Sequence, residues 1–235
     1  MIFRLYTIND KIRHMQKGLS LLLFFGILSS AYYVVINIIA TGYYPGYQTS
    51  SQTVSELSAI GAPSRHIWVM LCYLYSFLVI GFGLGIYVVT EGNKRLTTIG
   101  ALMFFYGVSG FFWPPMHQRE VIAAGNATMT DTLHLVFAGI TTVLMLVMIG
   151  LGVFSLGNKF RIYSIFTILV LIVFGTLTGI DSKHIRTGEP TPLIGIWERI
   201  NIGAFLVWAS VLSVVLLRSK KSVEESQFVS RPAID

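Results

Sequence analysis

The chain has 235 residues, of which 54% are hydrophobic and only 12% are charged. Soluble domains carry about 25% charged residues, so this composition and the mean hydropathy of +0.69 exclude an ordinary soluble domain. The single cysteine, Cys72, excludes an intrachain disulfide. The net charge of +6 would suit nucleic acid, but the basic residues flank apolar segments, so we expect membrane lipids and no nucleic acid as partners.

Six apolar segments are long enough to cross the hydrocarbon core of a bilayer, which takes about 20 helical residues. The segments contain almost no charged residues, and their apolar runs are continuous, which indicates helices and not barrel strands. The sequence therefore predicts an all-α fold, a polytopic membrane protein built as a six-transmembrane-helix bundle. The predicted spans are 18–40, 66–90, 96–114, 131–156, 162–180 and 196–217.

The positive charges predict the orientation of the bundle. Of the 17 lysines and arginines, 12 lie near the two termini and the short loops 91–95 and 157–161, and five lie in or beside the longer loops 41–65, 115–130 and 181–195. Because cytoplasmic loops are enriched in Lys and Arg, we expect both termini in the cytoplasm and the longer loops outside the plasma (inner) membrane. The parts would be a cytoplasmic amphipathic segment at 1–17, a membrane domain at 18–217 and a cytoplasmic polar tail at 218–235.

Histidines and carboxylates gather on the expected outer side. Asp131 opens the fourth span with His134 three residues later, a spacing that puts both side chains on one helix face. Imidazole and carboxylate groups form zinc sites, and a catalytic zinc has three protein ligands and an open position. One hypothesis is therefore a zinc-dependent hydrolase. Its metal ligands would be His117, His134 and His184, and its catalytic groups would be Glu198 and Asp131.

The same residues have a simpler interpretation. Asp131 would cap the N-terminus of its helix, where the macrodipole favours a carboxylate. Glu198 and Arg199 would form an ion pair at the membrane interface, and the histidines would be ordinary loop residues. The pattern leaves both interpretations open, because the two Asp-x-x-His steps lack the spacing of a tight metal motif.

The first outer loop contains its own helix signals. Thr53 and Glu56 have the spacing of a capping box, and the Gly-Ala-Pro sequence at 61–63 is a stop signal. We therefore expect a short helix over the outer mouth of the bundle. On and near this helix, Ser55, Glu56 and Arg199 are candidate ligands for the head group of a substrate.

Similar Gly-Leu-Gly steps occur at 83–85 and 150–152, and each is followed by a Gly-Asn-Lys turn. This self-similarity suggests duplicated helix hairpins, and convergence is the alternative, because glycines let membrane helices pack closely in any case. On either interpretation, we expect Gly85 and Gly152 to lie at helix–helix contacts.

Three stretches of the sequence together resemble a known family. They are Ser-Glu-Leu-Ser-Ala-Ile-Gly-Ala-Pro at 55–63, Asp131 with His134 at the start of the fourth span, and Gly-Ile-Trp-Glu-Arg-Ile at 195–200. They resemble the prokaryotic six-span membrane family catalogued as domain of unknown function 998, over residues 18–217. The resemblance implies a six-helix plasma-membrane protein and brings no established activity.

Three functional hypotheses follow from these patterns. The first is an outward-facing polar pocket that binds a lipid or another amphiphile and, in its sharper form, hydrolyses it with a metal-activated water. The second is a transporter, although no span contains the central charge or broken half-helix that transport sites use. The third is a non-catalytic structural or accessory membrane subunit, in which the polar cluster only seals helix ends. Zinc is the candidate cofactor for the hydrolase alone.

The orientation can be tested by thiol labelling of intact cells after Cys72 is replaced by Ser. Gln48→Cys and Thr187→Cys should react with an impermeant reagent, because both positions fall in expected outer loops. Gly92→Cys and Gly157→Cys should react only after the cells are opened. Labelling of Gly92→Cys in intact cells would reverse the predicted orientation.

Overall fold

The computed structural model describes the backbone of residues 2–90 and 92–229, and the side chains of residues 15–90 and 92–222. Within these residues every named element is a helix, and there is no strand. The elements in chain order are α1 (Ile2–Gly42), η1 (Val54–Ser58), α2 (Arg65–Val89), α3 (Lys94–Ser109), η2 (Gly110–Phe112), α4 (Arg119–Ala123), α5 (Met129–Val153), α6 (Asn158–Thr187) and α7 (Ile194–Val229).

Six of these helices are long and apolar enough to cross a membrane, which confirms the predicted six-helix membrane bundle. Large apolar side chains on α6, such as Ile162 and Phe166, are mostly exposed on the bundle surface. Such exposure is expected where lipid and not water surrounds a helix. The spanning stretches are Met15–Gly42, Arg65–Val89, Lys94–Phe112, Met129–Val153, Asn158–Thr187 and Ile194–Ser222.

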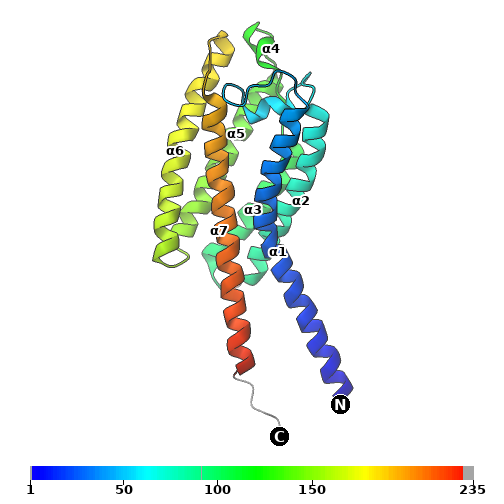
Figure 1. The fold of residues 1–235 in the computed structure, drawn as a ribbon. Coiled ribbons are helices and arrows are strands. Elements are labelled where there is room, and N and C mark those ends of the chain that lie inside the picture. Colours follow the sequence, from blue (N-terminus) through cyan, green and yellow to red (C-terminus); the bar gives the residue numbers. More distant parts are fainter. Residues whose placement is uncertain (1, 91, 230–235) are drawn as a thin grey trace.

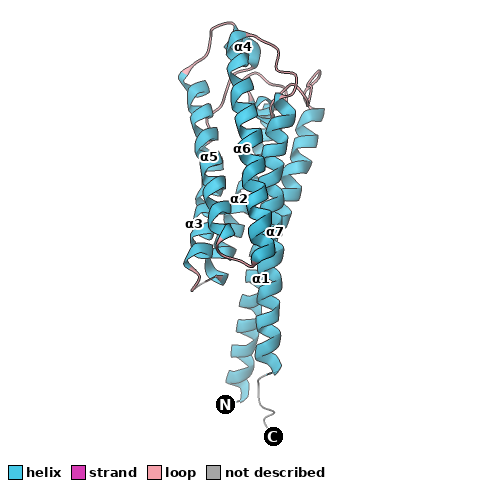
Figure 2. Ribbon diagram, turned by 90° about the vertical axis from the view of Figure 1, so that its left-hand side faces the viewer, coloured by secondary structure: helices cyan, strands magenta, loops and turns pink. Residues whose placement is uncertain are grey.

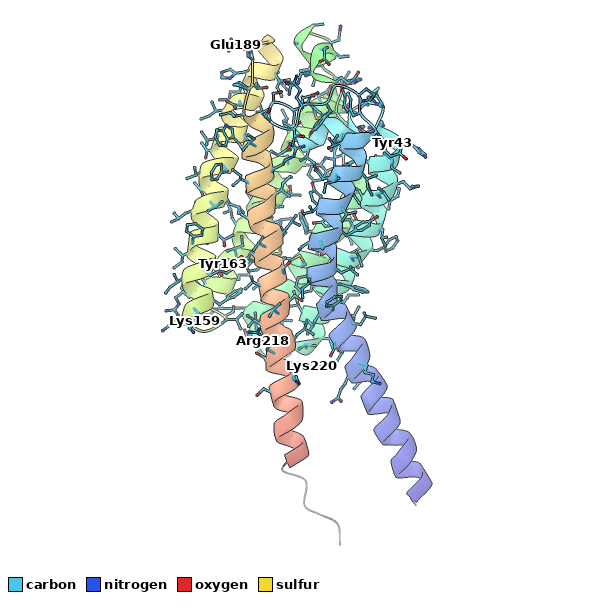
Figure 3. All side chains as sticks on the ribbon, viewed as in Figure 1. Tyr43, Lys159, Tyr163, Glu189, Arg218 and Lys220 are labelled. Carbon is cyan, nitrogen blue, oxygen red and sulfur yellow. The ribbon has the colours of Figure 1, made fainter. Side chains whose placement is uncertain are left out.

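The long helices pack in chain order, and α1 closes the arrangement against α7 (Figure 1). Both termini leave from one end of the bundle, which we call the terminal end (Figures 1 and 2). The opposite end carries η1, α4 and the longer loops, and we call it the loop end. Figure 3 shows Lys159, Arg218 and Lys220 toward the terminal end. This agrees with the charge asymmetry in the sequence, and the cytoplasmic location of the terminal end stays a prediction.

One apolar core joins all the long helices. Its members include one fully buried side chain from each of them: Leu23, Phe82, Met103, Met148, Leu171 and Trp208. The indole N–H of Trp208 donates to Ser164 Oγ at 3.0 Å, so the one polar group of this large side chain is satisfied. In lipid, close packing of this kind holds helices together, because lipid tails are as apolar as the core.

Glycines allow the closest contacts between helices. A Cβ atom on Gly85 would lie 2.9 Å from Leu22 Cβ and 3.0 Å from its carbonyl carbon, so α2 meets the backbone of α1 there. A Cβ atom on Gly152 would lie 2.8 Å from the ring of Trp208 on α7. The expectation that both glycines lie at helix–helix contacts is confirmed, while the duplication stays a prediction.

The largest difference from the predicted spans is at the end of α6. Asp181 and His184 were expected in a loop, but α6 continues to Thr187. The reason is that Gly188 is the first residue after the span to adopt the left-handed conformation that ends helices, with φ of 73°. The other predicted spans agree with the spanning stretches to within five residues at each end.

The predicted terminal segments are only partly described. The backbone of α1 begins at Ile2 and that of α7 ends at Val229, so helix extends into both segments. The side chains of residues 1–14 and 223–235 lie outside the described ones, and with them most of the predicted amphipathic face and polar tail.

Gly85→Ala should lower the thermal midpoint of the protein in detergent. The added Cβ would meet the α1 backbone, and overpacking costs about 1–3 kcal/mol. Gly150→Ala is the matched control, because a Cβ there meets nothing within 4 Å and Ala is the better helix former. Melts of the two variants followed by tryptophan fluorescence give the comparison. Equal midpoints would show that α1 and α2 are not in such close contact.

Candidate functional site

The loop end is organised by an ion pair between two loops. The capping box predicted from Thr53 and Glu56 is present at the start of η1. Arg119, the first residue of α4, donates from Nε to Glu56 Oε2 at 2.8 Å and from Nη2 to Oε1 at 2.5 Å. Glu56 is only 2% exposed, so its charge depends on this partner. The hydrogen bond to Glu56 in turn raises the pKa of Arg119.

The same guanidinium reaches the third loop. Arg119 Nη1 donates to Thr191 Oγ1 at 3.0 Å, and Nη2 donates to the Ser51 carbonyl at 2.7 Å. Three loops that are far apart in the sequence therefore meet at one side chain. Arg119 was missed in the sequence as a site residue, although it is the only Lys or Arg of the loop 115–130. That position marks it as a candidate partner for a buried acid.

Glu198 and Arg199 both bind the first loop, and in the described structure no ion pair joins them. Glu198 accepts hydrogen bonds from the Val54 backbone N–H and, at 3.3 Å, from Ser55 Oγ. Arg199 donates from Nη2 to the Tyr47 hydroxyl at 2.7 Å and from Nη1 to three backbone carbonyls. The expected interfacial pair of Glu198 with Arg199 is replaced by contacts that fasten the loop to α7.

The start of α7 is shaped for this loop. The Gly195 N–H donates to the Ser50 carbonyl at 2.9 Å, and a Cβ on Gly195 would clash with the carbonyl oxygens of Thr49 and Gln52. Burial raises the pKa of Tyr47 to about 12, so its hydroxyl keeps its proton and donates to a loop carbonyl at 2.7 Å. The Tyr47 hydroxyl therefore remains a hydrogen-bond donor to the loop at neutral pH.

The three predicted head-group ligands are all engaged within these loops. Glu56 binds Arg119, Ser55 donates to Glu198, and Arg199 holds backbone carbonyls. Their part in binding a substrate stays a prediction, and these contacts favour a structural role for them.

A second polar cluster surrounds the first turn of α5. Asp131 forms a capping box with Thr128 and accepts its backbone N–H at 2.7 Å, which confirms the interpretation of Asp131 as a helix cap. The same carboxylate accepts the His117 backbone N–H at 2.6 Å, and His117 Nδ1 lies 3.0 Å from Asp131 Oδ2. Two of the predicted site residues, Asp131 and His117, are therefore brought together.

His134 lies one turn further along α5 and is only 2% exposed. Its Nδ1 atom is 2.7 Å from the Pro114 carbonyl oxygen, which can only accept, and 3.2 Å from the Trp113 indole nitrogen, which can only donate. The two contacts require opposite tautomers, and the shorter one favours a proton on Nδ1. The Trp113 indole packs edge-on against the ring, with the centroids 5.5 Å apart. The other nitrogen, Nε2, is buried and has no hydrogen-bond partner in the described structure, which is rare for a buried polar atom.

The His134 ring lines a cavity of about 40 Å³ between α4, α5 and α6. This volume exceeds the roughly 10–15 Å³ that one water requires. Leu135 is 47% exposed and Arg186 is also exposed, so the cavity lies at the bundle surface. Its wall is mostly apolar, with Met116, Ile122, Leu135 and Ile185 beside the polar groups of Asp131, His134, Ser182 and Arg186.

The predicted third metal ligand makes separate contacts. His184 is 41% exposed, with Nδ1 3.9 Å from Asp181 and Nε2 3.6 Å from Glu189. Zinc needs its ligands at about 2.0–2.2 Å. Among the described side chains, no three His, Cys, Asp or Glu residues are grouped so that they could hold a metal ion. Glu198 makes its hydrogen bonds with the first loop and none with the histidines of the described structure.

Six apolar spans and a polar loop end define an all-α, multi-pass membrane protein. The chain belongs to the DUF998 family, described as a protein of unknown function, whose model matches residues 27–215. The match confirms the family resemblance seen in the sequence and includes the whole loop end and the cavity. Comparisons with curated proteins and with solved structures found no significant match.

Arg119→Gln should lower the free energy of unfolding by about 3 kcal/mol, because it leaves the buried Glu56 without its partner. The value is at the low end for buried pairs, since the Arg119 side chain is 22% exposed. The double variant Glu56→Gln/Arg119→Gln removes both charges and should unfold less easily than the single variant. Denaturant titrations in detergent measure both. A double variant no more stable than Arg119→Gln would contradict the charge pairing.

Proposed function

We propose that this protein binds the head group of a membrane lipid or another amphiphile in the cavity between α4, α5 and α6. One observation carries the proposal: a mostly apolar cavity at the bundle surface is also lined by four polar or charged side chains, those of Asp131, His134, Ser182 and Arg186. Small-molecule sites usually combine an apolar wall with a few placed polar groups. The lining of this cavity has that composition, which supports the binding of an amphiphile.

The place of the cavity along the bundle suits an amphiphile. It lies at the first turns of α5 and the last turns of α6, where the apolar stretches end. Leu135 presents an apolar surface that lipid chains would contact, and the exposed Arg186 lies in the last turn of α6, at the end of the apolar stretch, where we expect head groups. An amphiphile could therefore place its chain and its head against matching surfaces. On the orientation that the Lys and Arg distribution favours, this site opens to the outer leaflet of the plasma membrane.

The proposed activity is binding without metal chemistry. Metal-assisted hydrolysis needs about three protein ligands around one ion, and the described residues form no such group. A structural role is the second candidate, and the ion pair of Glu56 with Arg119 favours it because it fastens the loops. The two roles differ in one respect that can be measured, since a purely structural loop end would hold no ligand in the cavity.

Ser182→Phe should fill the cavity and reduce the lipid that stays bound during purification. Ser182 donates only to the Gly179 carbonyl, at 2.9 Å in its own helix, so the change should leave α6 intact. Thr187→Phe is the matched control, because Thr187 makes the same kind of bond, to His184 at 3.1 Å, and does not line the cavity. Native mass spectrometry counts the bound lipids. Unchanged lipid retention by a folded Ser182→Phe protein would refute the proposal.

A further inference from the structure

We infer that the terminal end has a phospholipid site of its own, in which the guanidinium groups of Arg95 and Arg161 together bind the phosphate of an anionic lipid. The two arginines lie in the first turns of α3 and α6, and both side chains reach the end of α5. This site is at the opposite end of the bundle from the cavity, so the inference does not rest on the proposed function.

The last carbonyl groups of α5 bring the two guanidiniums together. Arg95 donates from Nη1 to the Phe154 carbonyl at 3.0 Å, and Arg161 donates from Nε to the Val153 carbonyl at 3.2 Å. Val153 and Phe154 are consecutive residues, so their carbonyls are neighbours and the two cations lie side by side. The last carbonyls of a helix have no partner within it, and the negative end of the helix dipole favours cations there. The end of α5 therefore fixes both guanidiniums and offsets part of the repulsion between them.

Each guanidinium keeps most of its hydrogen-bond donors for a ligand. A guanidinium has five N–H groups, and the contacts with α5 use one of them on each arginine. Both side chains are exposed, and no ion pair between described side chains engages either of them. The loops 91–95 and 157–161 contain four lysines and arginines and one acid, Glu91, which lies outside the described residues. The excess of positive charge and of unused donors suits a phosphate group.

The surroundings of the arginine pair favour a lipid over a soluble phosphate. Phe154 is 62% exposed and Ile162 is 70% exposed, and the guanidinium carbon of Arg95 lies 5.9 Å from the centre of the Phe154 ring. Further into the apolar layer, α5 exposes Val147, and a Cβ on Gly150 would meet nothing within 4 Å. An acyl chain would therefore find an apolar helix face directly below the two arginines. Basic groups between spans at the edge of the apolar layer are a recognised kind of site for anionic head groups.

Diffuse attraction between basic residues and an anionic membrane is the alternative, and it has different consequences. Such attraction depends on net charge, so lysine and arginine contribute alike. The paired site depends on planar guanidiniums, which bind phosphate oxygens through two parallel hydrogen bonds that an ammonium group cannot form. Lys94 and Lys159 precede or follow the arginines in the same two loops, and both are exposed (Figure 3). They therefore provide a matched comparison for the arginine pair.

The test uses the full chain in phosphatidylcholine nanodiscs that contain a small fraction of phosphatidylglycerol, and native mass spectrometry counts the lipids that stay bound. Both lipids have a phosphate, but only phosphatidylcholine also carries a cation in its head group. Arg95→Lys/Arg161→Lys conserves the charge and should reduce retention of phosphatidylglycerol about tenfold relative to phosphatidylcholine. Lys94→Gln/Lys159→Gln removes two charges and should reduce it about twofold at most. The opposite order, or no loss in the arginine variant, would overturn the inference.

Because both arginines also bind the end of α5, a second measurement uses the unaltered protein. Phenylglyoxal modifies accessible guanidinium groups, and peptide mass spectrometry reports the extent at each arginine. Phosphatidylglycerol should slow the modification of Arg95 and Arg161 relative to pure phosphatidylcholine discs. Arg218, an exposed arginine of α7 at the same end, is the internal control and should react at the same rate in both (Figure 3). Equal protection of all three arginines would indicate a general effect of the anionic surface and would refute the paired site.

A final arm separates a lipid phosphate from a soluble one. Inorganic phosphate is added to the protein in pure phosphatidylcholine discs, and the modification of Arg95 and Arg161 is measured again. Protection by phosphatidylglycerol at a fraction of lipid at which inorganic phosphate has no effect would support the lipid site. Protection by inorganic phosphate alone would mean that the pair binds a soluble anion, which overturns the lipid inference. Protection by neither would show that the two arginines only cap α5.

Discussion

The guanidinium of Arg119 is the group on which the loop end depends. It binds the buried carboxylate of Glu56 on the first loop and reaches Thr191 on the third. Between these contacts it fixes the segment that precedes and forms α4, where the Ile60 N–H also donates to the Met116 carbonyl at 2.6 Å. Met116 and Ile122 of this segment form part of the cavity wall. The position of the cavity wall therefore follows from an ion pair in which no cavity residue takes part.

A buried ion pair contributes little net stability to a contact between loops, because removing both ions from water costs free energy that their attraction must offset. At the loop end, hydrogen bonds to the Glu56 carboxylate offset part of this desolvation cost. The Glu56 carboxylate accepts two hydrogen bonds from the guanidinium of Arg119 and a third from the Thr53 backbone N–H. Few of its lone pairs are therefore left without a donor. An apolar contact could stabilise the loops to a similar extent, but it has no preferred geometry of the kind that a hydrogen-bonded ion pair has. The charged pair instead defines one relative position of three loops, which an apolar contact would leave adjustable.

The features that the sequence predicts correctly are local ones. Each span is a continuous apolar run, the capping box of η1 uses residues three apart, and Asp131 stands in the first turn of the helix that it caps, so one short window contains each signal. The missed features join distant residues. Glu56 and Arg119 are 63 residues apart, and His134 binds a backbone carbonyl, which any residue type could provide. The predicted end of α6 was wrong because polarity does not distinguish a loop from a polar helix end. Asp181 and His184 are polar enough for a loop, but they lie in the last turns of α6, which continues past the apolar run.

The two histidines near Asp131 show why ligand types alone do not define a metal site. His117 approaches the carboxylate with both its backbone N–H and its ring, and His134, one turn into the helix, turns its Nδ1–H to a carbonyl instead. Because Asp131 is used as the cap of α5, its oxygens are occupied by donors and are not available to share an ion with His134. The helix cap and the metal site are thus competing uses of one carboxylate. In this chain the carboxylate of Asp131 caps α5, and His134 Nε2 is left buried without a hydrogen-bond partner among the described residues.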